Sequence, residues 1–75
     1  MQPISQTTSI VDAKVEDVLP KLGLAFVVDD DGHGWGVTRS TPGTEFDALT
    51  TGQRVRLRLQ RHPTYSVVQE YRLLD

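Results

Sequence analysis

The chain has 75 residues, no cysteine and a formal net charge of −2. Its length allows one domain around one core, and the lack of cysteine excludes disulfides and thiolate metal sites. No apolar run approaches the ~20 residues that cross a bilayer, and the N-terminus lacks the pattern of a signal peptide. We therefore expect a cytoplasmic protein, of bacterial type.

The charged residues are unevenly distributed along the chain. The first 50 residues carry eight acidic and three basic residues, whereas the last 25 carry five arginines and two acidic residues. A total charge near zero argues against strong, sequence-independent binding to nucleic acid. The arginines near the C-terminus nevertheless predict a local cationic surface.

The N-terminal part predicts a tail followed by a strand. Residues 1–7 are polar and without periodicity, which indicates a disordered tail before a single domain over residues 8–75. Apolar and polar residues alternate over residues 9–18, which is typical of a strand. A short helix over residues 15–19 is the alternative, and Pro20 ends either element because it lacks a backbone donor.

Two further strands follow, joined by a hairpin. Residues 24–28 form an almost continuous apolar run of strand length. Residues 29–32 are of types that are common in turns, and they end in a glycine that can take a positive φ. Residues 33–39 return as the third strand, and two glycines leave one of its faces bare.

The segment over residues 40–49 has the signals of a single helical turn. Thr41 precedes a proline and Thr44 precedes a glutamate, so either threonine could cap the turn. Such a turn would bury Phe46 and Leu49.

Residues 53–61 give the strongest signal in the chain, because apolar and cationic side chains alternate strictly. Successive side chains of a strand point to opposite faces, so the apolar residues of this stretch are expected in the core. The arginines then stand together on the exposed face. The apolar set is Val55, Leu57 and Leu59, and the arginine row is Arg54, Arg56 and Arg58.

A loop and a fifth strand over residues 65–74 complete the order: three strands, a helical turn and two strands. We predict an all-β fold, a five-stranded OB-fold-like Greek-key barrel with a short helical turn between strands 3 and 4. An SH3-like small barrel is the alternative, since it also has five short strands and one helical turn.

Three segments carry a family resemblance over about half of the chain. Asp31-Gly32-His33-Gly34-Trp35-Gly36-Val37 is similar to the lysine-glycine-aromatic-glycine-aromatic strand of cold-shock-type nucleic-acid-binding domains. Leu49-Thr50-Thr51-Gly52-Gln53-Arg54-Val55 resembles the start of that family's fourth strand, and Gly23-Leu24-Ala25-Phe26-Val27 resembles a strand of related ribosomal OB repeats. The resemblance implies an OB barrel that binds single-stranded RNA or DNA.

Such domains stack bases on aromatic rings and meet phosphates with cations. We therefore predict a monomer that binds single-stranded RNA or DNA weakly across its exposed sheet face. The expected nucleic-acid-binding residues are Phe26, His33, Trp35, Arg39, Arg54, Arg56, Arg58 and Tyr65.

Two other interpretations stay open. Trp35 and Phe26 could belong to the core, with the arginine row solvated or paired within the molecule. Alternatively, the same face could bind a protein partner, as in an adaptor or regulatory module.

No metal, cofactor or catalytic site is expected. Residues 29–32 have part of a calcium loop but lack its alternating ligands and its distal glutamate. His33 and His62 lack a paired ligand spacing. Neither a glycine-flanked nucleophile nor a pair of catalytic carboxylates is evident, so we do not expect an enzyme.

Overall fold

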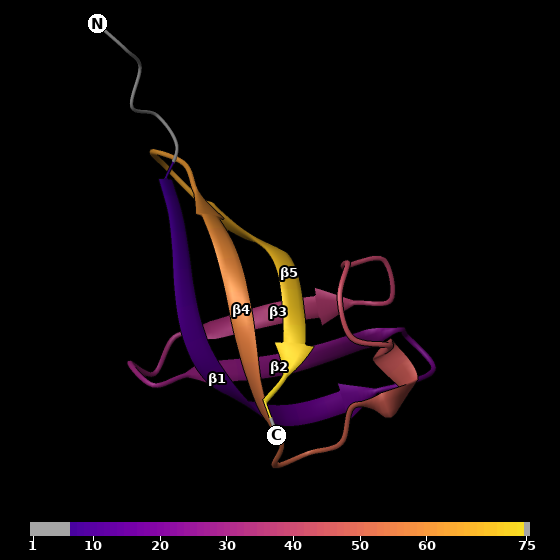
Figure 1. Cartoon of the computed structure of the whole chain (residues 1–75). Coiled ribbons are helices and arrows are strands. Elements are labelled where there is room, and N and C mark those ends of the chain that lie inside the picture. Colours follow the sequence, from indigo (N-terminus) through magenta and orange to yellow (C-terminus); the bar gives the residue numbers. More distant parts are fainter. Residues whose placement is uncertain (1–6, 75) are drawn as a thin grey trace, which may run out of the picture.

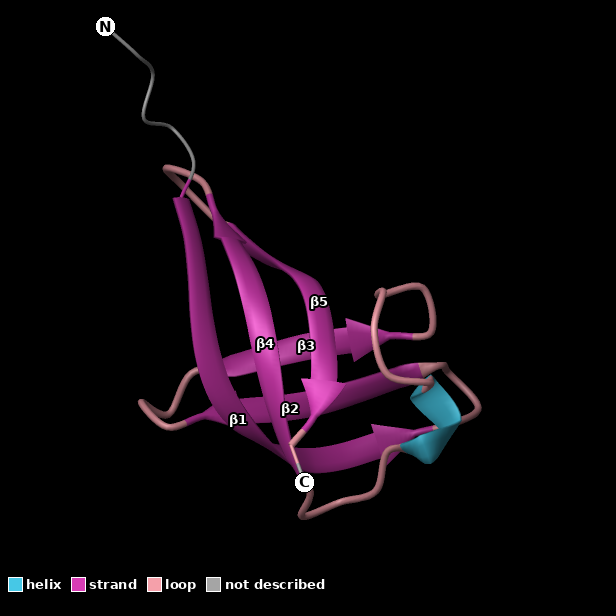
Figure 2. Ribbon diagram, in the orientation of Figure 1, coloured by secondary structure: helices cyan, strands magenta, loops and turns pink. Residues whose placement is uncertain are grey.

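The computed structural model describes residues 7–74 and consists of one five-stranded antiparallel sheet with a single 3₁₀ turn (Figures 1 and 2). The order of strands in the sheet is β3-β2-β1-β4-β5. This arrangement confirms the all-β, five-stranded barrel, with its short helical turn between the third and fourth strands. The elements are β1 (Thr7–Leu19), β2 (Leu24–Asp29), β3 (Gly34–Thr38), η1 (Phe46–Ala48), β4 (Arg54–Arg61) and β5 (Ser66–Leu73).

The expected disordered tail falls largely on residues 1–6, which lie outside the described residues; Thr7 is the first residue of β1. Within residues 7–74, no helix is long and apolar enough to cross a membrane.

β1 belongs to both halves of the sheet. Residues 7–14 pair with β4 and residues 13–19 pair with β2, so one strand joins the two halves. The register skips Glu16, which marks a bulge, and bulges increase the local bend and twist. Figure 1 shows β1 running beside β4 and then turning to run beside β2. The alternative helix over residues 15–19 does not form, because this stretch pairs with β2 instead.

The core lies on the concave side of this curled sheet. The alternation expected of β4 is confirmed, since its three inward residues have no exposed surface. Phe46 and Leu49 close one end and are 5% exposed each, as the sequence predicted. The buried core residues are Ala13, Val15, Ala25, Val27, Val37, Phe46, Leu49, Val55, Leu57, Leu59 and Tyr71.

Backbone contacts between the segment before η1 and β5 close the barrel. The Thr44 amide donates to the Tyr71 carbonyl over 3.1 Å, and the Tyr71 amide donates to the Pro42 carbonyl over 3.1 Å. Gly43 lies between these bonds with a φ of +132°, and a Cβ at this position would overlap the Tyr71 carbonyl. Only glycine therefore fits this crossing without strain.

Neither threonine expected to cap the helical turn does so. The residue before η1 is Glu45, which makes no side-chain capping bond. The Thr44 hydroxyl accepts a hydrogen bond from the Leu73 amide at 2.9 Å, and the Thr41 hydroxyl accepts one from the Thr38 amide at 3.0 Å. These threonines hold β5 and the end of β3 in place.

The segment that resembles the start of a cold-shock fourth strand has a structural role here. Gly52 takes a φ of +96° and its amide donates to the Val15 carbonyl over 2.8 Å. The Val15 amide in turn donates to the Gln53 carbonyl over 2.8 Å, while the Gln53 side chain accepts from the Thr50 amide at 2.9 Å. The glycine-glutamine pair thus forms the turn that joins β4 to β1 beside the bulge.

Candidate metal site

The hairpin between β2 and β3 holds a buried acidic residue at its base. Asp29 is the last residue of β2, and its side chain is only 4% exposed. The Asp29 amide donates to the His33 carbonyl, and the Gly32 amide donates to the Asp29 carbonyl, both over 2.9 Å. Gly32 has a φ of +89°, which lets the chain reverse direction within this short turn.

The Asp29 carboxylate is held by three N–H donors. Its Oδ1 accepts from the backbone amides of Asp31 and His33, both at 2.9 Å, and its Oδ2 accepts from the Trp35 indole Nε1 at 3.0 Å. The indole hydrogen bond is the largest cause that lowers the pKa of Asp29 below the usual 3.8, while burial opposes it. The carboxylate is therefore ionised at neutral pH.

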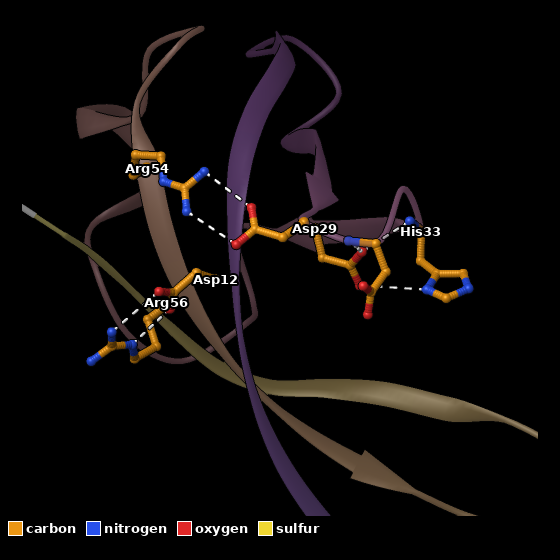
Figure 3. A network of polar contacts seen from close by, with 7 residues as sticks. Asp12, Asp29, His33, Arg54 and Arg56 are labelled. Carbon is orange, nitrogen blue, oxygen red and sulfur yellow. Dashed lines mark hydrogen bonds and ion pairs between the residues drawn. The ribbon is translucent and has the colours of Figure 1, made fainter.

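Asp29, Asp31 and His33 form a compact group of metal-ligating side chains. One ligand atom from each residue lies within 4.8 Å of the other two. His33 places its Nδ1 3.7 Å from Oδ2 of Asp29 (Figure 3). Since Oδ1 of Asp29 already accepts two hydrogen bonds, Oδ2 is the oxygen with the larger capacity for a further partner.

This group was not predicted from the sequence, where residues 29–32 were compared with a calcium loop and His33 was considered apart from them. The signal that could have found it is spacing, since the three ligands occupy alternate positions of a five-residue stretch in which the chain reverses direction. A tight hairpin brings such positions together, and imidazole nitrogen can complete a set of carboxylate oxygens.

Asp30 is directed to a different partner. Its carboxylate accepts hydrogen bonds from both terminal nitrogens of Arg54, at 3.2 and 3.4 Å. This contact joins the start of β4 to the hairpin. Arg54 thus balances the negative charge of Asp30, which would otherwise repel the neighbouring carboxylates.

Every guanidinium of the arginine row has an acidic partner. The pairs are Arg54–Asp30 (3.2 Å), Arg56–Asp12 (2.8 Å) and Arg58–Glu70 (2.5 Å). The hydrogen bond from Arg56 lowers the pKa of Asp12, and the same bond raises the pKa of Arg56. The row points away from the core, as the alternation predicted, but its charge is balanced within the molecule.

The aromatic residues expected to stack bases lie in separate places. Trp35 is half-buried, packs against the core and is bound to Asp29. Phe26 is 45% exposed on the outer face of β2. Tyr65 lies in the β4–β5 loop, where its ring stacks on His62 with 4.4 Å between centroids.

Arg39 and His33 complete the predicted set. Arg39 binds the Asp47 carboxylate at 2.7 Å and the Pro20 carbonyl at 3.0 Å, and its guanidinium lies 4.9 Å from the centre of the Phe46 ring. It therefore stabilises the η1 region. The hairpin, in contrast, brings together His33, Trp35 and, through Asp30, Arg54.

No protein-family model and no curated protein matches this chain. Among solved structures, the fold is similar to that of apo-CusF residues 6–88 from Escherichia coli. The two structures superpose with a TM-score of 0.69 at 13% sequence identity, over 100% of this chain and 96% of that chain. At this identity the likeness shows a shared barrel fold.

These findings correct the functional prediction made from the sequence. The binding of single-stranded RNA or DNA is a wrong prediction, because the arginine row is paired with carboxylates and the Trp35 indole is bound to Asp29. The solved structure reported above as similar in fold, apo-CusF, lends no support to a cold-shock domain. The alternative, a protein partner on the same face, stays a prediction. Within residues 7–74, the side chains brought together in a group that could hold a metal ion are Asp29, Asp31 and His33, in the β2–β3 hairpin.

Proposed function

We propose that this protein binds a divalent metal cation in the β2–β3 hairpin, through Asp29, Asp31 and His33. The observation that carries the proposal is the convergence of three ligand atoms within 4.8 Å of one another. Two carboxylates and one imidazole from a five-residue stretch would supply a charge of −2 to the cation. The proposed role is binding and not catalysis.

The surroundings of Asp29 favour this role. Its pKa is lowered by the Trp35 hydrogen bond, so the carboxylate is ionised without help from the metal. Trp35 and two backbone amides fix its orientation, as outer-shell donors do around ligating groups in metalloproteins. Asp31 and His33 are exposed, and His33 already places its Nδ1 3.7 Å from Oδ2 of Asp29. Water would complete the coordination.

The donor set indicates which cations fit. Imidazole nitrogen together with carboxylate oxygen suits borderline first-row cations such as Zn²⁺ and Cu²⁺, whereas soft Cu⁺ prefers sulfur ligands. The chain has no cysteine and only Met1 as a thioether, and Met1 lies outside the described residues. Ca²⁺ takes six to eight oxygen ligands, more than this turn offers. The likeness to CusF, known in an apo form, supports a binding role for the fold.

A titration of the purified protein with Zn²⁺ and Cu²⁺, followed by calorimetry and by Trp35 fluorescence, tests the proposal. We expect 1:1 binding and a change in the fluorescence of Trp35, whose indole contacts Asp29. His33→Ala should weaken binding about tenfold or more, which corresponds to about 1.4 kcal/mol.

His62→Ala is the matched control, because His62 stacks on Tyr65 in the β4–β5 loop. It should leave the affinity unchanged. Equal losses in the two variants, or binding that His33→Ala does not alter, would contradict the proposed site. The cytoplasmic location expected from the sequence stays a prediction alongside this proposal.

A further inference from the structure

A groove on the outer face of β1, β4 and β5 lies apart from the hairpin cluster. It has a volume of about 200 Å³. Its lining residues are Ile10, Arg56, Arg58, Glu70, Tyr71 and Arg72. Tyr71 lies opposite the buried Leu57 and is itself 1% exposed, so its ring faces the core. The charged side chains on either side of it in β5 therefore point outward and form the wall of the groove.

Two arginines face each other across neighbouring strands in this groove. Arg56 of β4 lies directly opposite Arg72 of β5 in the antiparallel register. Residues in such positions share a face, and like charges directly opposite each other are destabilising. Every other arginine of the outer face described above is paired, so this juxtaposition stands out.

Arg72 has no hydrogen bond or ion pair from its side chain within residues 7–74. Arg56 uses Nε and one terminal nitrogen to bind Asp12, at 2.8 and 3.3 Å, which leaves its other terminal nitrogen available. Three guanidinium groups thus meet only two carboxylates, Asp12 and Glu70. The groove keeps one uncompensated positive charge next to unused N–H donors.

We propose that this groove binds a small oxyanion of the phosphate or sulfate type between Arg56 and Arg72. An anion there would relieve the repulsion between the two guanidinium groups. Planar guanidinium forks match the oxygen geometry of such anions. Ile10, which is 56% exposed, forms an apolar side of the groove. One excess charge fits a single small anion and not the backbone of a polymer, so this inference differs from the corrected nucleic-acid prediction.

The test is an NMR titration of the metal-free protein with inorganic phosphate, compared with sodium chloride at matched ionic strength. We expect saturable shifts of the backbone amides of residues 56–58 and 70–72 with phosphate only. Arg72→Gln should weaken binding about tenfold, because it removes both the positive charge and the guanidinium fork that would bind the oxygens of the anion. Arg72→Lys, which keeps the charge and loses the fork, should give an intermediate loss.

Arg61→Gln is the matched control, because Arg61 donates to the Ser9 hydroxyl and does not line the groove. It should bind phosphate as the unmodified protein does. Shifts that rise linearly with either salt, or an Arg72→Gln variant with unchanged affinity, would overturn the proposal. A mixed-sequence oligonucleotide that bound more tightly than inorganic phosphate would also overturn it.

Discussion

The indole Nε1 of Trp35 donates a 3.0 Å hydrogen bond to Oδ2 of Asp29, from one strand of the β2–β3 hairpin to the end of the other. This contact places an ionised carboxylate beside the core. The carboxylate oxygen can still accept a further hydrogen bond or bind a cation. The contact also gives the single tryptophan of the chain a structural role in the hairpin.

Replacing Trp35 with Phe should destabilise the hairpin. The substitution keeps an aromatic ring but removes the donor to the buried Asp29 carboxylate, and a lost partner of this kind costs about 1–3 kcal/mol. Urea denaturation would measure the loss. The pKa of Asp29, followed by NMR, should also rise toward 3.8, because the indole bond is the largest cause that lowers it. An unchanged Asp29 pKa would show that the bond does not hold the carboxylate.

Acid should destabilise the protein through Asp29 and Asp12. Both carboxyl groups have a pKa below the usual 3.8 in the folded protein, Asp29 through Trp35 and Asp12 through Arg56. Between the folded and unfolded pKa values the unfolded chain binds more protons, so stability rises with pH there. The contribution is present above about pH 4 and is lost as the pH falls through the folded pKa values.

Chemical denaturation at pH 2 to 7 would reveal this loss. Asp29→Asn should flatten the curve below pH 4, because asparagine does not titrate. A variant with the same acid dependence as the unmodified protein would rule out Asp29 as a source.

Gly43→Ala should be among the most disruptive small substitutions. The added Cβ would overlap the Tyr71 carbonyl oxygen and would also force a φ of +132° on an L-residue. We expect a loss of about 3 kcal/mol or more, since strain and a lost closing contact add together. Gly34→Ala is the matched control, because its Cβ would meet nothing within 4 Å. Thermal unfolding of the two variants should therefore differ clearly, and similar midpoints would argue against the closure described for β5.

Leu59→Ala should cost about 2–5 kcal/mol, because Leu59 has no exposed surface and the change leaves a cavity. Leu22→Ala removes the same atoms from a side chain that is 73% exposed, and its effect should stay within about 0.5 kcal/mol. Denaturation midpoints of the pair give the comparison. A large loss in the Leu22 variant would mean that this turn packs against the domain in solution.

The fold could be predicted from the sequence because its signals are local. The strict alternation over residues 53–61 determined which side chains of β4 face the core, and the structure buries those residues completely. The glycine at position 32 predicted the hairpin by an equally local signal, because the positive φ that the turn requires is a property of a single residue.

The pairing of the arginine row with carboxylates could not be predicted in this way. Arg56 is balanced by Asp12, which lies 44 positions earlier and reaches it only through the register of β1 with β4. A one-residue change of that register would have placed another side chain opposite Arg56. The hairpin cluster is local and was within reach of sequence reasoning, but it required His33 to be considered together with the aspartates.

The shared strand β1 has a consequence for how the chain acquires its shape. The hairpins β1–β2, β2–β3 and β4–β5 join neighbouring segments, whereas the pairing of Ile10 with Arg58 must bring distant parts of the chain together. Contacts of such high sequence separation slow folding, to milliseconds or seconds in small β-barrels. We expect the two ends of β1 to gain protection from hydrogen exchange together, because neither half of the barrel is complete without this strand.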